Sequence, residues 1–295
     1  MSHQITIKPS NHVFTVHDGE TILEAALREG FVIAYGCRNG ACGTCKGKVL
    51  EGLVDYGKYQ EHALPDTEKK VGMALFCQAR PLTDLGVECR EIGAAKDIQI
   101  RTLPCRVQKM RRIAPDIMML YLKLPAHERL QFLAGQYIDI LMKDGMRRSL
   151  SMASAPHDDT FLQLHLRNYG GPFSDYVFHR MTEKEILRFE GPLGTFFLRE
   201  DSAKPIILLA SGTGFAPIKA IVEHVLYKGI KRPMTLYWGG RVRADLYMND
   251  LAEQWQREHG VRYVPVLSDA RPEDRWTGRT GLVHRAVTED HPDLS

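Results

Sequence analysis

Three of the six cysteines of this chain share one short loop, Tyr35-Gly36-Cys37-Arg38-Asn39-Gly40-Ala41-Cys42-Gly43-Thr44-Cys45. Their spacing is C-x4-C-x2-C, and Cys77 follows Cys45 after 31 intervening residues. This spacing, with a distant fourth cysteine, is typical of a loop that holds a [2Fe–2S] cluster through two thiolates per iron. We therefore predict Cys37, Cys42, Cys45 and Cys77 as the metal ligands.

The glycines of the loop favour this chemistry, because a chain that wraps a compact anionic cluster needs unusual φ angles and close backbone approach to sulfur. Gly36, Gly40 and Gly43 allow both at little steric cost. Two other interpretations stay open: a structural zinc site, which usually uses two short-spaced cysteine pairs, and a set of unrelated thiols. Cys89 and Cys105 have no partner at ligand spacing, and we expect them to be structural.

The length and charge of the chain limit the class of protein to which it can belong. Its 295 residues are enough for two or three domains. With 39 Lys and Arg against 36 Asp and Glu, the formal charge is +3, so the basic field that nucleic acid needs is missing. The apolar runs are about five residues long, far short of a membrane span. Residues 1–8 show no secretion signal. Without one, six cysteines are expected as thiols or metal ligands and not as disulfides, which favours a cytoplasmic protein.

Strand and helix patterns surround the cysteine loop. Ile5–Ile7 and Val13–Val16 alternate as strands, and Thr21–Arg28 has apolar residues at helical spacing before Gly30. Together with its cysteine spacing, this part of the chain resembles the plant-type ferredoxins. The resemblance implies a β-grasp fold and a [2Fe–2S] ferredoxin domain, which we place at residues 1–95.

The middle third has the pattern of an all-β domain. A change of composition at Glu91-Ile92-Gly93-Ala94-Ala95-Lys96 indicates a linker before it. Short alternating runs such as Met118–Leu122, Tyr137–Met142 and Leu162–Leu166 are then separated by Gly, Pro and Asp. About six such strands predict a closed antiparallel β-barrel over residues 100–200.

The segment Arg147-Arg148-Ser149-Leu150-Ser151, which we expect in a loop, resembles the R-x-Y-S flavin motif of the ferredoxin–NADP reductase superfamily. The resemblance implies that Arg148 pairs with the pyrophosphate of FAD, for which a guanidinium fork is suited. It also implies that Ser151, as the catalytic residue, forms a hydrogen bond near flavin N5. Leu150 stands where the family has an aromatic residue, so it offers only apolar contact to the flavin ring.

Other segments of the barrel extend this resemblance. Ala134-Gly135-Gln136-Tyr137 resembles a P-G-Q-Y strand of the superfamily, and Glu190–Phe196 resembles the turn that closes its barrel. Ser174 is expected to cap a helix N-terminus, whose free N–H groups can hold a pyrophosphate. The further flavin-binding residues that we predict are Tyr137, His165, Arg167, Gly171, Phe173 and Ser174.

The last third, residues 204–295, has the pattern of a dinucleotide-binding domain. The apolar run Pro205–Ala210 predicts a strand buried on both faces, and a helical pattern, Ile218–Leu226, follows a Gly-rich turn. That order places phosphates on a helix N-terminus, and the turn is similar to the G-T-G-F-A-P of the reductase superfamily. Arg241, after the next strand, can favour a ribose phosphate or be an ordinary surface arginine. The predicted nicotinamide-site residues are Gly212, Thr213, Gly214, Phe215, Ala216, Pro217, Gly239, Arg241 and Ser268.

The whole domain order resembles that of NADH-dependent oxygenase reductases. The W-T-G-x-T-G-x-V-H segment of the CDP-6-deoxy-Δ3,4-glucoseen reductase-like group matches Trp276–His284. The resemblance implies three cofactors: a [2Fe–2S] cluster, FAD, and NADH or NADPH. It implies that hydride passes from nicotinamide to flavin, and single electrons then pass to the cluster and to an acceptor protein, an oxygenase or a deoxysugar dehydratase-type enzyme.

Family members continue beyond the equivalent of Ser295. We therefore expect a truncated parallel α/β sheet with Pro205–Ala210 at its edge, and slow reduction by NADH because the nicotinamide pocket is incomplete. Two other functions stay open. One is a one-electron ferredoxin-type carrier with a non-functional nicotinamide half, and the other is a zinc-stabilised interaction protein.

Overall fold

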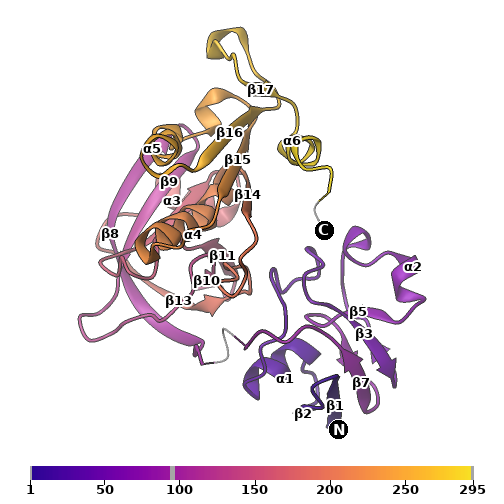
Figure 1. The fold of residues 1–295 in the computed structure, drawn as a ribbon. Helices are drawn as coiled ribbons and strands as arrows, with labels where there is room; N and C mark the ends of the chain where they lie inside the picture. Colours follow the sequence, from indigo (N-terminus) through magenta and orange to yellow (C-terminus); the bar gives the residue numbers. More distant parts are fainter. Residues whose placement is uncertain (1, 94–96, 294–295) are drawn as a thin grey trace. The chain divides into compact units, whose positions relative to one another are not determined.

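The computed structural model describes residues 2–93 and 97–293, which form two compact units (Figure 1). The first unit contains Met1–Gln99 and Leu193–Phe196, and the second contains Ile100–Pro192 and Phe197–Ser295. Of the expected linker, Glu91 forms an antiparallel bridge with Ile33 and Ile92 is buried, so both belong to the first unit. Residues 94–96 of that linker lie outside the described residues.

A mixed five-stranded sheet organises the first unit, in the order β2-β1-β7-β3-β5. Its strands are β1 (His3–Lys8), β2 (Val13–Val16), β3 (Lys46–Glu51), β5 (Met73–Leu75) and β7 (Leu85–Glu88). The smaller elements are α1 (Ile22–Arg28), β4 (Val54–Asp55), η1 (Glu61–Ala63), α2 (Asp66–Lys69) and β6 (Arg80–Pro81). β1 and β2 form the expected antiparallel hairpin, and β1 pairs with β7 in parallel. This arrangement confirms the β-grasp fold.

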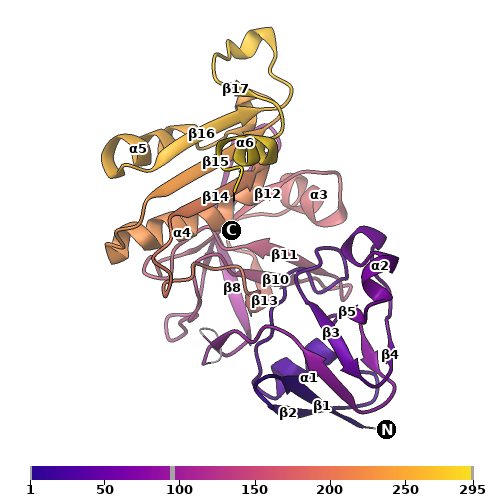
Figure 2. The same ribbon diagram turned by 45° about the vertical axis from the view of Figure 1, so that its right-hand side comes forward.

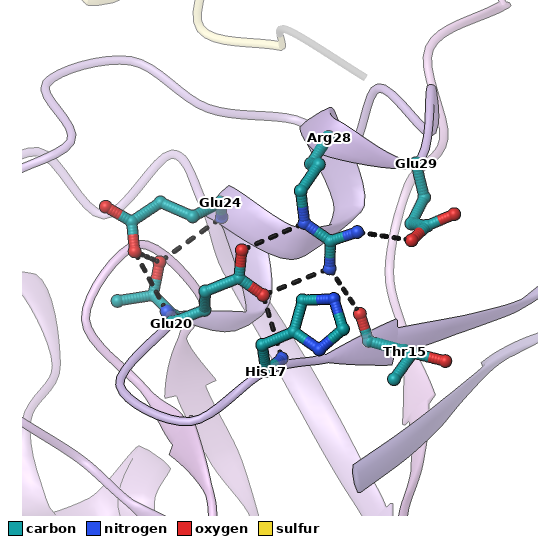
Figure 3. A network of polar contacts seen from close by, with 7 residues as sticks. Thr15, His17, Glu20, Glu24, Arg28 and Glu29 are labelled. Atoms are coloured by element: carbon teal, nitrogen blue, oxygen red, sulfur yellow. Dashed lines mark hydrogen bonds and ion pairs between the residues drawn. The ribbon is translucent and has the colours of Figure 1, made fainter. Parts of the chain in front are cut away.

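Helix α1 begins where the sequence places a capping box. The Thr21 hydroxyl accepts a hydrogen bond from Glu24 N at 3.2 Å, and the Glu24 carboxylate accepts one from Thr21 N at 2.9 Å. At the other end, Arg28 donates to Glu20 at 2.9 Å and to the carbonyl of Thr15 at 2.7 Å (Figure 3). The helix is thereby fixed to β2 and to the turn before it.

Six antiparallel strands form the barrel of the second unit, in the order β11-β10-β13-β8-β9-β12. They are β8 (Arg101–Ala114), β9 (Ile117–Lys123), β10 (Tyr137–Leu141), β11 (Arg147–Ser151), β12 (Leu162–Arg167) and β13 (Ile186–Leu193). A bridge between Met152 and Leu164 joins the two outer strands, and Ala153 N donates to Gln163 O at 2.7 Å. These contacts close the sheet, so the predicted barrel is confirmed.

Two predictions about the barrel segments are corrected. The Arg147–Ser151 motif lies in strand β11 and not in a loop, because it pairs along its length with β10. Glu190–Leu193, predicted as part of the closing turn, belongs to β13. The chain leaves the barrel only after it, and Thr195 then bonds to the backbone of Tyr35 within the first unit.

The second unit continues as a four-stranded parallel sheet, in the order β14-β15-β16-β17. The strands are β14 (Ile206–Ser211), β15 (Met234–Gly240), β16 (Arg262–Leu267) and β17 (Arg279–Thr280). The helices of the second unit are α3 (Pro172–His179), η3 (Gly212–Gly214), α4 (Phe215–Lys228), η4 (Arg243–Asp245), α5 (Asn249–His259), η5 (Pro272–Asp274) and α6 (Val283–Asp290). α4 and α5 pack on one face of the sheet with Trp238, and α6 packs on the other with Tyr237 (Figure 2).

The prediction that strand 205–210 is buried on both faces is wrong. Ile206, Leu208 and Ala210 are buried under α4, whereas Ile207 is 36% and Leu209 42% exposed. On the second face, α6 buries Tyr237 of β15 but leaves these two side chains of β14 partly uncovered in the described chain. β14 is the edge strand of the described sheet, as expected.

Candidate functional site

The four predicted metal ligands form two close pairs of thiols. Cys37 N donates to Cys42 Sγ at 3.4 Å, and Ala41 N donates to Cys37 Sγ at the same distance. A hydrogen bond between the Cys45 and Cys77 thiols, together with burial, raises the pKa of Cys45, and the same bond lowers the pKa of Cys77 to about 7. Among the described residues, no three His, Cys, Asp or Glu side chains are placed to hold one metal ion.

Two positions of the loop are too crowded for a side chain, one beside sulfur and one beside the backbone of a neighbouring segment. A Cβ on Gly36 would lie 3.2 Å from Cys42 Sγ, and one on Gly40, at φ +76°, would lie 2.8 Å from Lys58 O. Backbone N–H groups directed at sulfur and two thiol pairs suit a cluster that takes two thiolates per iron. The residues present therefore fit a [2Fe–2S] cluster.

A cavity of about 290 Å³ lies where β11, β12, η3 and the start of α3 come together. β12 reaches β11 because the barrel closes between them. The predicted residues that line the cavity are Arg148, Leu150, His165, Arg167, Gly171, Phe173, Ser174 and Thr213. Ser149, Leu166 and Tyr169 line it as well and were not predicted. Tyr137 and Ser151, which face each other across β10 and β11, are not among the lining residues.

Ser174 has a different place from the one predicted. α3 begins at Pro172 with Gly171 as its N-cap, so Ser174 is the third residue of the helix. Its hydroxyl donates to Gly171 O at 2.9 Å and accepts from Gly171 N at 3.1 Å. The side chain thus orders the helix start and leaves the first N–H groups of α3 beside the cavity.

The polar atoms around this cavity suit a cofactor with phosphate and hydrogen-bonding groups. Arg148 and Arg167 supply positive charge. One buried atom of a lining residue, His165 Nε2, has no hydrogen-bond partner in the described part of the chain. Burial, with a smaller contribution from the Lys219 ammonium, lowers the pKa of His165 to about 3, so this imidazole is neutral. The residues present fit FAD.

A second cavity, of about 450 Å³, lies at the carboxyl ends of the parallel strands, where open α/β sheets bind nucleotides. The predicted residues Gly212, Gly239, Arg241 and Ser268 line it, and so does Arg167. Lining residues that were not predicted are Tyr169, Leu209, Ser211, Gly240, Asp245, Gly281, Leu282, Val283 and His284. A Cβ on Gly239 would lie 2.7 Å from Val283 Cβ, so only glycine lets β15 approach α6 here.

Four residues of the predicted turn do not line either cavity. Gly214, Phe215, Ala216 and Pro217 continue from η3 into α4. Phe215 is fully buried and stacks on Trp238 with 3.8 Å between ring centroids. Ala216 is buried as well, so these two residues have a packing role, and the turn reaches the cavities only through Gly212 and Thr213.

One buried carboxylate holds an arginine that lines both cavities. Asp245 Oδ1 accepts from Arg167 Nη2 at 2.5 Å, and its Oδ2 accepts from Arg241 N at 2.8 Å. Burial acts to raise the pKa of Asp245, but the Arg241 N–H and the Arg167 charge outweigh it and lower the pKa. Arg167 and Tyr169 line both cavities. The sequence predicted Arg241, in the segment after β15, as a site residue but did not predict Asp245. The partners Arg167 and Asp245 are 78 residues apart in the sequence, so no local pattern indicates their contact.

Three known families match successive parts of the chain. The 2Fe-2S iron-sulfur cluster binding domain matches residues 5–82, the oxidoreductase FAD-binding domain residues 104–198, and the oxidoreductase NAD-binding domain residues 208–295. With the thiol pairs and the two cavities, these matches define an NAD(P)H-dependent iron–sulfur flavoprotein oxidoreductase. Its cofactors are a [2Fe–2S] cluster, FAD and a nicotinamide dinucleotide.

Relatives match along the whole chain. A CDP-6-deoxy-L-threo-D-glycero-4-hexulose-3-dehydrase reductase of Yersinia pestis is 40% identical over 100% of this chain and 88% of its own length. The phenol 2-monooxygenase reductase component DmpP of a Pseudomonas species is 34% identical over 97% and 82%. The crystal structure of the Amycolatopsis cytochrome P450 reductase GcoB is similar with a TM-score of 0.77 and 35% identity, over 99% and 88%.

The chain therefore belongs to the family of [2Fe–2S] flavoprotein reductases that transfer electrons from NAD(P)H through FAD to the cluster. This result confirms the predicted fold class, cofactors and reaction. No described helix combines the length and apolar character that a membrane span needs.

Proposed function

We propose that this chain passes its electrons to a separate acceptor enzyme, a dehydrase that acts on a nucleotide-linked deoxysugar. The observation that carries this proposal is the full-length similarity to a relative named as the reductase of such a dehydrase. The exposed side chain of Cys42 supports it, because an accessible edge of the cluster loop allows transfer to another protein. An oxygenase is the second candidate, favoured by the similarity to DmpP.

Residues that line the flavin cavity would contact different parts of FAD. Arg148 would hold the pyrophosphate, together with the free N–H groups at the start of α3. Leu150, which lines the cavity, would lie against the ring, whereas Ser151, the next residue of the same strand, does not line it. When bound, FAD supplies the step from two-electron to one-electron chemistry, and the protein supplies orientation and exclusion of water.

The second cavity would hold the nicotinamide dinucleotide. At Gly212 and Gly239 the protein backbone can approach the ligand closely, because neither residue has a side chain. Ser268 and Arg241 offer polar contacts at the strand ends. Arg241 is tied to Asp245, since its Nε lies 3.4 Å from Asp245 Oδ2. The four cysteines would hold the cluster as the pairs Cys37 with Cys42 and Cys45 with Cys77.

Anaerobic spectroscopy tests the proposed function directly. The purified protein, loaded with iron, sulfide and FAD, is mixed with NADH or NADPH and then with a candidate dehydrase or oxygenase. We expect the flavin and cluster absorbance to bleach with one of the nucleotides and to return when the dehydrase turns over its substrate. A cluster that responds only to dithionite would instead identify a one-electron carrier. Return of colour only with a stoichiometric amount of the oxidised oxygenase, whose own redox centre accepts the electrons without O2, would favour the second candidate.

A single substitution tests the proposed flavin site. Arg148→Ala removes a charge-assisted contact of about 1.5–3 kcal/mol, which weakens FAD binding roughly ten- to a hundredfold. Titration of the flavin-free protein with FAD measures this change. Arg188→Ala is a matched control, because Arg188 comes from β13 and does not line the cavity. Equal FAD affinity in the two variants would show that the pyrophosphate lies elsewhere.

A further inference from the structure

Two side chains of β12 bond to two side chains beyond β15. Arg167 Nη2 donates to Asp245 Oδ1 at 2.5 Å, and His165 Nδ1 lies 2.8 Å from the Tyr247 hydroxyl. His165 and Arg167 are two positions apart in β12, and Asp245 and Tyr247 are two positions apart after β15, so the two bonds lie side by side. We call these two pairs the clasp. Both pairs lie within the second unit, and they connect the barrel to the nucleotide-binding sheet.

The charged half of the clasp is buried. The side chains of Arg167 and Asp245 are each 6% exposed, and Asp116 contributes a second carboxylate 3.0 Å from Arg167 Nε. A buried guanidinium needs such partners, because an uncompensated buried charge is strongly destabilising. Asp245 also accepts from Arg241 N, so one carboxylate fixes both an arginine of the barrel and the backbone at the end of β15.

The guanidinium held in this way is a lining group of both cavities. A Cβ on Gly212 would lie 3.3 Å from Arg167 Nη1, so the turn after β14 approaches the guanidinium directly. Of the three guanidinium nitrogens, Nη2 bonds to Asp245 and Nε pairs with Asp116, while Nη1 is the one nearest the turn. Its N–H groups are thus available to ligands, while Nη2 is used by Asp245.

The uncharged pair of the clasp, His165 and Tyr247, restricts the movement of β12. The ring of Tyr247 meets His165 and Trp238 edge-on, with 5.4 and 5.2 Å between centroids. Its hydroxyl has His165 as its one hydrogen-bond partner among the described residues. The two pairs together leave β12 and the segment after β15 little freedom to shift against each other.

We propose that Asp245 is a positioning residue for the reaction, since it holds Arg167 where one guanidinium contacts both the bound flavin and the bound nucleotide. This inference rests on the proposed assignment of FAD to the cavity lined by β11 and β12. Fixing the guanidinium before either ligand binds removes an ordering cost from both binding steps. It also fixes the mutual orientation of the two ligands, on which the rate of their reaction depends.

Ligand binding to the flavin-free and loaded protein tests the proposal without the acceptor enzyme. Asp245→Asn keeps the shape of the side chain and removes its charge. We expect the Kd of FAD to rise roughly tenfold, and the Kd of NAD+ for the loaded protein to rise as well. In an Arg167→Gln background, Asp245→Asn should cause no further loss of FAD affinity, because Asp245 acts through Arg167.

A second ion pair of the same domain supplies the control. Asp290 bonds to Arg279 at 2.7 Å, and neither residue lines a cavity, so Asp290→Asn should leave both affinities unchanged. Tyr247→Phe should weaken FAD binding in the same direction as Asp245→Asn, about two- to tenfold, since it removes one neutral hydrogen bond. Arg148→Ala, measured in parallel, reports separately on whether FAD occupies this cavity.

Three results would overturn the proposal. The first is an unchanged FAD affinity in Asp245→Asn, and the second is an equal loss with and without Arg167. If Asp245→Asn does not fold, Arg167→Lys keeps the charge but loses the guanidinium fork. An Arg167→Lys protein that binds FAD and NAD+ like the wild type is the third such result.

Discussion

Cys45 is the most buried of the four proposed cluster ligands. Its thiol lies in the buried pair with Cys77. Serine offers a harder ligand with a shorter metal bond, and we expect iron and sulfide to fall sharply in Cys45→Ser while flavin content is unchanged. Chemical analysis of iron, sulfide and flavin in the purified variant measures all three.

Cys89→Ser is the control for that substitution. Cys89 is half-buried and burial raises its pKa to about 12, so it is a protonated structural thiol. Its replacement should leave the iron content at the wild-type level. Full iron content in Cys45→Ser, or an equal loss in Cys89→Ser, would refute the ligand assignment.

His165 gives the second unit a specific dependence on pH. Its pKa falls from 6.5 to about 3 on folding, so between these values the unfolded chain binds a proton that the folded one does not. Stability contributed by the neutral imidazole is therefore complete above pH 6.5 and is lost as the pH falls towards 3, by about 1.4 kcal/mol per pH unit.

Denaturant unfolding at several pH values measures this loss for the wild type and for His165→Gln. The glutamine variant should be less stable at pH 7 but lose stability more slowly between pH 6 and 4. His127→Gln, at a side chain that is 83% exposed, should follow the wild-type slope. Parallel curves for wild type and His165→Gln would mean that this histidine is protonated in the folded protein.

At the scale of elements, helix α1 depends on its capping box more than on its length. It has seven residues, too few to be stable alone, and Thr21 and Glu24 satisfy each other's backbone N–H groups. Thr21→Ala should cost about 1 kcal/mol and lower the melting temperature of the first unit by about 4–8 °C. Thr67→Ala, at an exposed position of α2, is the control and should melt like the wild type.

Elements with a local signal could be predicted from the sequence, and contacts between elements could not. The alternation in Val13–Val16 and the helical spacing in Thr21–Arg28 are local signals, and the structure has a strand at Val13–Val16 and a helix at Ile22–Arg28. Ser174 was predicted as the N-cap of α3, but the N-cap is Gly171, three residues earlier. Both residue types suit a helix start, so the sequence alone did not distinguish them. The partial exposure of Leu209 depends on where α6 lies, and the Arg167–Asp245 pair joins β12 of the barrel to η4 of the nucleotide-binding domain. Neither can be read from neighbouring residues.

At the scale of the whole molecule, the cofactor sites belong to different compact units. The cysteine loop lies in the first unit, and both cavities lie in the second. The second unit has its own cores, one around the barrel residues Val107 and Phe189 and another around Phe215 and Trp238. A ligand that binds one unit should therefore stabilise that unit by mass action without a matching effect on the other.

Calorimetry of the holoprotein should accordingly show two unfolding transitions. FAD at a free concentration of a hundred times its Kd adds about 2.7 kcal/mol, so its removal should lower only the transition of the second unit, by about 5–10 °C. Removal of iron with a chelator should lower only the other transition, and the Cys45→Ser variant identifies which one that is. A single transition, or one in which FAD and iron removal shift the same peak equally, would show that the two units unfold together, and the stability of each cofactor site would then depend on the occupancy of the other.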